Sequence, residues 1–261
     1  MTVRINDDLE RLAAYQYLED LAQGQRVLEI GCGSGLGARQ LLEAGAAEVV
    51  GVGDEIEAAR ELLGGAVTLR RWRPPRLAFA QDDSFGLVIL TDATVLLQQP
   101  RLLEEIVRVV RHDGWVVLHA ACADHPDINE GMSYGALLDL VEPHFEEVRI
   151  VGQCPFTAYS LVELSEEPQD ELDIMLDGGL MEGGVEEVIR YLVLCTSREA
   201  AQMALPYGIV QVPSISDPSA ESSADADEAP LPPRPATLKR YTDRAGGRVS
   251  RWTWPAFSRA R

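Results

Sequence analysis

The chain has 261 residues, of which 46% are hydrophobic and 25% are charged, a composition typical of a soluble protein with one sizeable core. Its 42 acidic residues outnumber 23 basic ones and give a net charge of −19, which disfavours a general role in gripping nucleic acid. The sequence shows neither a long apolar run nor the basic-then-apolar pattern of a secretory signal. We therefore expect a cytoplasmic protein that binds neither nucleic acid nor membrane.

Composition divides the chain into three parts. Residues 1–205 carry the strand and helix patterns, with an acidic surface insertion expected at 165–184. Residues 206–235 are rich in Ser, Ala, Asp and Pro with little to bury, which predicts a flexible linker. Residues 236–261 combine Arg with Trp and Phe. This tail is expected either to dock onto a protein partner or to remain a disordered basic end.

The first part begins with a helical pattern. Asn6 is the expected cap, and Leu9, Ala13, Tyr17 and Leu21 lie at i, i+4 spacing along one ridge. The sequence therefore predicts a helix that packs through this ridge.

Short runs of Val, Ile and Leu then alternate with helical patterns. Strands are predicted at 26–30, 48–52, 66–70, 85–90 and 114–120, and helices at 35–45, 54–65 and 100–114. A helix at 132–142 and strands with antiparallel pairing at 145–152, 156–164 and 188–197 are expected to follow. This order predicts an α/β fold, a Rossmann-like and mostly parallel sheet flanked by helices.

The strongest local signal is the string VLEIGCGSG, in which an apolar strand runs into alternating glycines and then a helix. Gly31, Gly33 and Gly35 permit positive φ and a close approach of a ligand to the backbone, and the helix that follows offers free N–H groups. Glu29 is expected either to accept hydrogen bonds from a ligand or to hold the loop in shape. Cys32 is expected to lie beneath the loop as a small filler.

Glycine spacing alone does not identify the ligand of this loop, and two interpretations remain open. Because Gly37 follows closely, the loop partly overlaps a dinucleotide-binding pattern, and the glycines also suit a tight turn kept for packing.

The string Glu-Ile-Gly-Cys-Gly-Ser-Gly resembles motif I of class I S-adenosylmethionine-dependent methyltransferases, and residues 84–118 are similar to the later part of that family's domain. The resemblance implies S-adenosylmethionine as the cofactor. In that family the glycine loop packs against the methionine part, an acid after the second strand binds the ribose and an acid after the third strand meets the adenine. By resemblance, the cofactor-binding residues at the loop are Glu29, Gly31, Cys32, Gly33 and Gly35.

Beyond the loop the chain departs from the family. Gly53 stands where the ribose-binding acid is usual, so Asp54 is the expected substitute, unless it serves only as an acid at a helix start. Trp72 lies where an aspartate commonly meets the adenine, and it is expected to stack on the base instead. Gly86 replaces an aspartate that commonly precedes the fourth strand's apolar core.

Polar residues follow the fourth and fifth strands at the edge where open α/β sheets bind ligands. Thr91 and Asp92 are expected to face cofactor or substrate, with a helix-capping Asx turn as the alternative. After the fifth strand, the stretch from His119 to Tyr134 is the expected substrate loop. If the acceptor must lose a proton, His125 or Asp124 is the predicted catalytic base, the alternative being a solvated surface pair. No metal site is expected here, because the spacing matches no tetrahedral pattern.

Three functions remain open at this point. The first is methyl transfer to a small molecule or a protein side chain. The second is a catalytically inactive methyltransferase fold that docks partners through its surface and its C-terminal tail. The third, a nucleotide-binding oxidoreductase, fits the glycine spacing less well.

Overall fold

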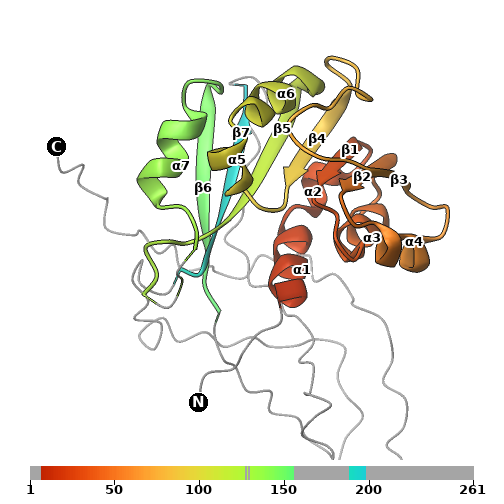
Figure 1. Ribbon diagram of the computed structural model, residues 1–261, viewed down its shortest axis with the longest axis horizontal. Helices are drawn as coiled ribbons and strands as arrows, with labels where there is room; N and C mark the ends of the chain where they lie inside the picture. Colours follow the sequence, from red (N-terminus) through yellow and green to blue (C-terminus); the bar gives the residue numbers. More distant parts are fainter. Residues whose placement is uncertain (1–6, 127, 129, 156–187, 198–261) are drawn as a thin grey trace, which may run out of the picture. The chain divides into compact units, whose positions relative to one another are not determined.

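The computed structural model describes residues 7–126, 128, 130–155 and 188–197, in which seven strands form one sheet of order β3-β2-β1-β4-β5-β7-β6 (Figure 1). The strands are β1 Arg26–Ile30, β2 Glu48–Gly53, β3 Thr68–Arg71, β4 Phe85–Leu90, β5 Val110–Ala121, β6 Glu147–Gln153 and β7 Arg190–Thr196. The helices are α1 Asp7–Tyr17, α2 Glu19–Ala22, α3 Leu36–Glu43, α4 Glu57–Leu63, α5 Val95–Gln98, α6 Arg101–Val109 and α7 Tyr134–Val141.

Strands β1 to β5 run parallel, and β7 pairs antiparallel with both β5 and β6. The strand order reverses between β1 and β4, and open α/β sheets bind ligands at the carboxyl ends of the strands beside such a reversal. The predicted fold class and antiparallel late strands are confirmed. The expected strand 156–164, the acidic insertion 165–184, the linker 206–235 and the tail 236–261 lie outside the described residues.

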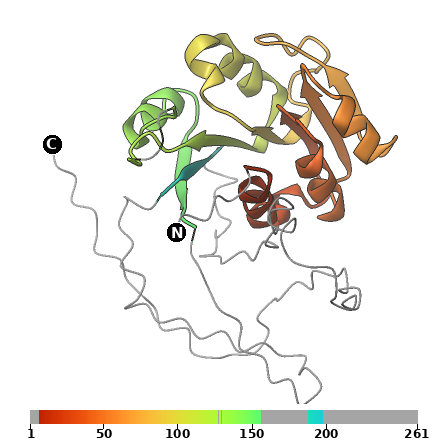
Figure 2. The same ribbon diagram turned by 60° about the horizontal axis from the view of Figure 1, so that its bottom comes forward.

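Side chains alternate along each strand and build one apolar core on either face of the sheet. On one face, Leu28, Val88 and Val116 pack with the buried side chains of α5, α6 and α7. On the other face, Val27 and Ile89 pack with α1, α2, α3 and α4 (Figures 1 and 2). The glycine loop and α1 therefore share one face of the sheet.

The prediction of a helix over residues 100–114 is wrong at its C-terminal end. Helix α6 stops at Val109, and the chain continues directly into β5, where Val110 pairs with Phe85 before a register shift in the ladder. Gly86 and Gly114 lie so close across this bulge that a Cβ at Gly114 would be 3.0 Å from the Gly86 carbonyl oxygen. A side chain at Gly114 would therefore press on the β4 backbone, so the β4–β5 ladder at this bulge favours glycine there.

Helix α1 also packs differently from the expected ridge. Its buried side chains include Ala14 and Tyr15 rather than Ala13 and Tyr17, and Leu18 just after the helix is fully buried. The helix is therefore rotated about its axis, so that Tyr15 faces the sheet. No helix of the described residues is long and apolar enough to cross a bilayer.

The core beneath α6 gives a direct test of this packing. We expect Leu103→Ala, which removes a side chain only 2% exposed, to lower the free energy of unfolding by about 2–5 kcal/mol because it leaves a cavity. Leu97→Ala, at a leucine that is 63% exposed, is the matched control and is expected to change it by less than about 0.5 kcal/mol. Urea denaturation measures both, and equal effects would contradict the packing described.

Candidate functional site

The loop that joins β1 to α3 depends on its glycines, and two of them, Gly31 and Gly35, leave no room for a side chain. Gly31, Gly33 and Gly35 have φ of 89°, 48° and 84°, in the left-handed region that favours glycine. A Cβ at Gly31 would collide with Thr91 Oγ1, and one at Gly35 would lie 2.9 Å from Ala59 Cβ. The loop thus presents bare backbone at the carboxyl end of β1.

Glu29 is buried beneath this loop, with 1% of its surface exposed. One carboxylate oxygen, Oε1, accepts a hydrogen bond from the Tyr15 hydroxyl, while Oε2 is buried without a partner. Burial raises the pKa of Glu29 to about 7, although the Tyr15 hydrogen bond and the Arg11 charge act in the opposite direction. Gly37 makes room for the pair, because a Cβ there would collide with both Glu29 and Tyr15.

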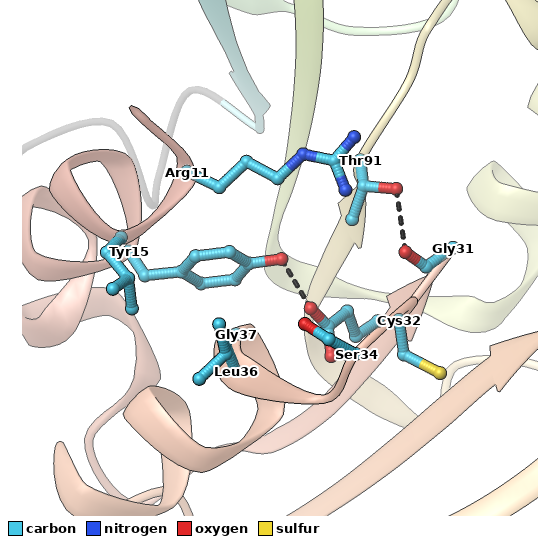
Figure 3. Close-up of a pocket in the computed structure, with 10 residues that line it drawn as sticks. Arg11, Tyr15, Gly31, Cys32, Ser34, Leu36, Gly37 and Thr91 are labelled. Atoms are coloured by element: carbon cyan, nitrogen blue, oxygen red, sulfur yellow. Dashed lines mark hydrogen bonds between the residues drawn. The ribbon is translucent and has the colours of Figure 1, made fainter. Parts of the chain in front are cut away.

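A small pocket separates the loop from α1 (Figure 3). Figure 3 shows Tyr15 pointing at the loop and the Arg11 side chain extending from α1 toward Thr91. The pocket has room for about 20 Å³, which is enough for about one water molecule. Its lining comprises Arg11, Leu12, Tyr15, Glu29, Gly31, Cys32, Ser34, Leu36, Gly37 and Thr91.

A second, open hollow of about 350 Å³ lies at the ends of β2 and β3. It is lined by Asp54, Arg71, Trp72 and Arg73. The Trp72 backbone N–H donates to the Gly53 carbonyl at 2.7 Å, and its indole N–H donates to the Arg76 carbonyl at 2.6 Å. Trp72 is therefore fixed beside Asp54 and stays out of the glycine-loop pocket.

Thr91 and Asp92 both follow β4, but only Thr91 lines the pocket. The Thr91 hydroxyl donates to the carbonyls of Ile30 and Gly31, at 3.1 and 3.0 Å, so it fixes the glycine loop and lines the pocket. The Asp92 carboxylate accepts from the Thr94 N–H and hydroxyl, at 3.0 and 2.6 Å, which is the Asx turn stated as the alternative.

Comparison with known proteins bears on this arrangement. Residues 28–118 match the family model described as a methyltransferase domain. An S-adenosylmethionine-dependent methyltransferase from Mesorhizobium loti is similar in structure, with a TM-score of 0.51 and 15% identity over 71% of this chain and 96% of that one. The resemblance to class I methyltransferases is confirmed.

Two further solved structures are similar to this methyltransferase-like chain. One, from Aquifex aeolicus, is 14% identical over 72% of this chain and 90% of its own, with a TM-score of 0.49. A TehB-like methyltransferase from Corynebacterium glutamicum is 15% identical over 70% of this chain and 86% of its own, with a TM-score of 0.48. Likeness at such low identity concerns the fold alone. No curated protein sequence matches this chain.

Two departures from the family pattern have local explanations in this methyltransferase-like domain. At Gly86 a Cβ would collide with the Gln25 side-chain amide, so Gln25 occupies the space of the usual aspartate. At the end of β2, Gly53 leaves Asp54 at the edge of the open hollow, where its carboxylate accepts the Glu55 N–H at 3.0 Å. Burial raises the pKa of the Cys32 thiol to about 12, which keeps the thiol protonated beneath the loop.

The two residues predicted as the catalytic base, Asp124 and His125, lie away from the glycine loop. The Asp124 carboxylate accepts from the Tyr134 N–H at 3.0 Å and from the Tyr191 hydroxyl at 3.1 Å, on the face of the sheet that holds α7. The His125 backbone N–H donates to the Cys122 carbonyl within the same turn. Neither residue lines the pocket, so their catalytic role stays a prediction.

Residues on α1 complete the site, and sequence reasoning missed them. Among the described residues, five side-chain polar atoms are buried without a hydrogen-bond partner, and one of these belongs to Ser197. The other four belong to Arg11, Glu29, His119 and Gln153, which we name the α1 seam. Glu29 and His119 contact Tyr15, and Gln153 donates to the Glu10 carbonyl at 2.9 Å. Since native proteins satisfy nearly all buried polar atoms, this clustering makes the α1 seam a candidate for bound water or a polar ligand.

The raised pKa of Glu29 predicts how stability depends on pH. Between about pH 4.5 and 7 the unfolded carboxyl loses its proton while the folded one keeps it, so its contribution to stability is lost as pH rises through that range. We expect Glu29→Gln to remove this loss, and to be more stable relative to the wild type at pH 8 than at pH 4 by roughly 1–3 kcal/mol.

Urea denaturation of both proteins at a series of pH values measures the difference. Glu43→Gln, at an exposed carboxylate on α3, is the control, and the fall in stability with pH should persist in it. A constant difference between wild type and Glu29→Gln across the range would show that the buried carboxyl is not shifted.

Proposed function

We propose that the protein is an S-adenosylmethionine-dependent methyltransferase that binds its cofactor between the glycine loop and α1. One observation carries the proposal: a buried carboxylate oxygen of Glu29 and a buried guanidinium nitrogen of Arg11, both without partners, line one small pocket beside bare backbone. The methionine part of the cofactor carries an ammonium and a carboxylate. These two charges complement Glu29 and Arg11.

The remaining contacts follow from the same placement. Glu29 would accept a hydrogen bond from the ammonium, and Arg11 would pair with the carboxylate. The open hollow at the ends of β2 and β3 would take the nucleoside, with Asp54 beside the ribose and Trp72 against the base. Because the loop pocket has room for about one water molecule, side chains of α1 must move aside when the methionine part enters.

When bound, S-adenosylmethionine supplies an electrophilic methyl group on a positively charged sulfur. Methyl transfer needs alignment more than acid–base machinery, so the residues here act mainly by positioning. Thr91 fixes the Gly31 carbonyl, and Tyr15 fixes the Glu29 carboxylate. Helix α1 lines one side of the pocket through Arg11, Leu12 and Tyr15. The acceptor is a small molecule or a protein side chain.

A second function, a catalytically inactive methyltransferase fold that docks partners, is favoured by two observations. The pocket at the glycine loop is small, with room for about 20 Å³, and the position of the ribose-binding acid is Gly53. Both functions predict the same fold, and cofactor binding separates them.

Titration with S-adenosylhomocysteine tests the proposal. We expect the wild type to bind it with micromolar affinity and Gly33→Asp to bind at least about tenfold more weakly, because a carboxylate enters the loop beside the ligand. Space around Gly33 is open and aspartate tolerates its φ, so the variant is expected to fold.

Gly24→Asp is the matched control, because Gly24 also has positive φ and open surroundings but precedes β1 at the opposite edge of the sheet. Calorimetry should find its affinity unchanged. Absence of binding by the wild type up to millimolar ligand would favour the inactive, partner-docking fold. Selective binding of a nicotinamide cofactor would favour the oxidoreductase.

Recognition of the amino-acid end can be tested separately. We expect S-adenosylhomocysteine to bind at least about tenfold more tightly than 5′-methylthioadenosine, which lacks the amino and carboxylate groups, because each charged hydrogen bond contributes roughly 1.5–3 kcal/mol. Arg11→Met and Glu29→Gln should shrink this preference, and Arg39→Met, on the exposed side of α3, should leave it intact. Equal affinities for the two ligands in the wild type would refute the assignment.

A further inference from the structure

The open hollow at the ends of β2 and β3 contains positive charge that the proposed cofactor does not use. S-adenosylmethionine has an uncharged nucleoside, and its ammonium and carboxylate are assigned to Glu29 and Arg11 in the other pocket. In the proposed function, Asp54 and Trp72 contact the ribose and the base. The arginines of the hollow are therefore left without a partner group on the cofactor.

The chain is locally basic at this hollow. Residues 62–81 contain four arginines and no acidic residue, although the whole chain has a net charge of −19. All four arginines are exposed, and they are Arg70, Arg71, Arg73 and Arg76. Positive charge that gathers beside an open hollow favours an anionic ligand there.

Two of these arginines line the hollow, and they differ in how far their charge is compensated. Arg71 forms an ion pair with Glu57 of α4, so its charge already has a partner. Arg73 is exposed to the hollow, and no acidic side chain in the part of the chain that the structure describes pairs with it. The guanidinium of Arg73 is therefore the group that an anionic ligand would meet.

Trp72 forms a fixed wall of the same hollow. Its backbone N–H and its indole N–H are both hydrogen-bonded within the chain, and its ring packs against the core. An aromatic ring that is already held in place loses little conformational freedom when a base stacks on it, and such stacking tolerates every base. A base on Trp72 lies beside Arg73, because the two residues are neighbours in the chain and line one hollow.

We propose that this hollow binds a nucleoside monophosphate, with the base stacked on Trp72 and the phosphate paired with Arg73. A guanidinium suits phosphate because it donates two parallel hydrogen bonds to it. Asp54 repels a phosphate placed beside it, so the phosphate lies on the Arg73 side of the hollow. The volume of about 350 Å³ falls within the range of small-molecule sites, roughly 300–1,000 Å³.

The consequence is competition between the nucleotide and the cofactor, a part of the inference that rests on the proposed function. Both ligands place a base against Trp72, so they exclude each other. The cofactor gains Glu29 and Arg11 in the glycine-loop pocket, whereas the nucleotide gains Arg73. A nucleoside monophosphate therefore inhibits methyl transfer by occupying the nucleoside half of the site.

Titration of the full chain with four separate ligands tests the site. They are adenosine, its 2′- and 5′-monophosphates, and inorganic phosphate. We expect at least one monophosphate to bind at least about threefold more tightly than adenosine at low salt, because an exposed ion pair contributes modestly. Inorganic phosphate, which cannot stack on Trp72, should bind at least about tenfold more weakly than that monophosphate. About 1 M salt should remove the preference over adenosine, since it screens charges beyond roughly 3 Å.

Variants of Arg73 assign the preference to its charge. Arg73→Met should abolish the preference for the monophosphate and keep the affinity for adenosine within about twofold, while Arg73→Lys should restore part of the preference. Arg101→Met is the matched control, at an exposed arginine that begins α6 and lines neither pocket. The preference should persist in it.

A competition titration separates this inference from the cofactor proposal. Saturating S-adenosylhomocysteine should weaken the apparent affinity for the monophosphate at least about tenfold. Equal affinities for adenosine and both monophosphates, or a preference that survives in Arg73→Met, would overturn the nucleotide site while the cofactor proposal stands. A wild type that binds both ligands at once would overturn the competition. Failure to bind S-adenosylhomocysteine would overturn the cofactor proposal, and the monophosphate titrations would still decide the nucleotide site.

Discussion

The carboxyl group of Glu29, buried between the glycine loop and α1, is the constraint on which the site depends. A charged carboxylate in an apolar interior is costly unless hydrogen bonds and a positive charge compensate it. The chain provides a hydrogen bond from Tyr15, the charge of Arg11 and a smaller contribution from the Ala38 backbone N–H, and the second oxygen of Glu29 has no close hydrogen-bond partner. The compensation is therefore incomplete within the described protein, and the pKa of the group stays raised.

Because some buried polar atoms lack hydrogen-bond partners, ligand binding at the site is expected to affect how α1 docks on the sheet. Each buried polar atom without a partner costs roughly 1–3 kcal/mol, and four of them lie in the α1 seam. A ligand that supplies the missing partners recovers this free energy, so binding and the docking of α1 on the sheet are expected to reinforce each other. The ion pair between Glu10 and Arg190 and the hydrogen bond between Tyr15 and Glu29 hold the helix at two points.

The sequence predicts the sheet and the glycine loop because both have strong local patterns. Runs of Val and Ile mark strands covered on both faces, and the three alternating glycines of the loop all have the positive φ that their spacing suggests. The roles of Arg11 and Tyr15 could not be read in the same way. A ridge through Ala13 and Tyr17 is more apolar than one through Arg11 and Tyr15, so hydrophobic periodicity favours the wrong face of α1.

The remaining differences between the sequence-based predictions and the structure come from tertiary contacts. Helix α6 ends at Val109 because the next residue, Val110, pairs with Phe85 of β4, a partner that lies 25 residues earlier in the sequence. Asp124 and His125 stand out in sequence as polar residues after a strand, but the chain turns them toward α7, where Tyr191 binds the Asp124 carboxylate. His119 instead remains in the strand. Its ring lies 5.8 Å from the Tyr15 ring, a contact that no local sequence pattern indicates.

Compared with the methyltransferase pattern that it resembles, the chain differs at the position proposed for the nucleoside and agrees at the glycine loop. Gly53 offers no carboxylate, and Asp54 lies in an open hollow where water screens its contacts, so each hydrogen bond there contributes little. Glu29 is only 1% exposed, and charge-assisted hydrogen bonds to a buried group are stronger than those in water. In the proposed function, α1, which supplies Arg11 and holds Glu29 through Tyr15, would therefore control the affinity for the methionine part of the cofactor.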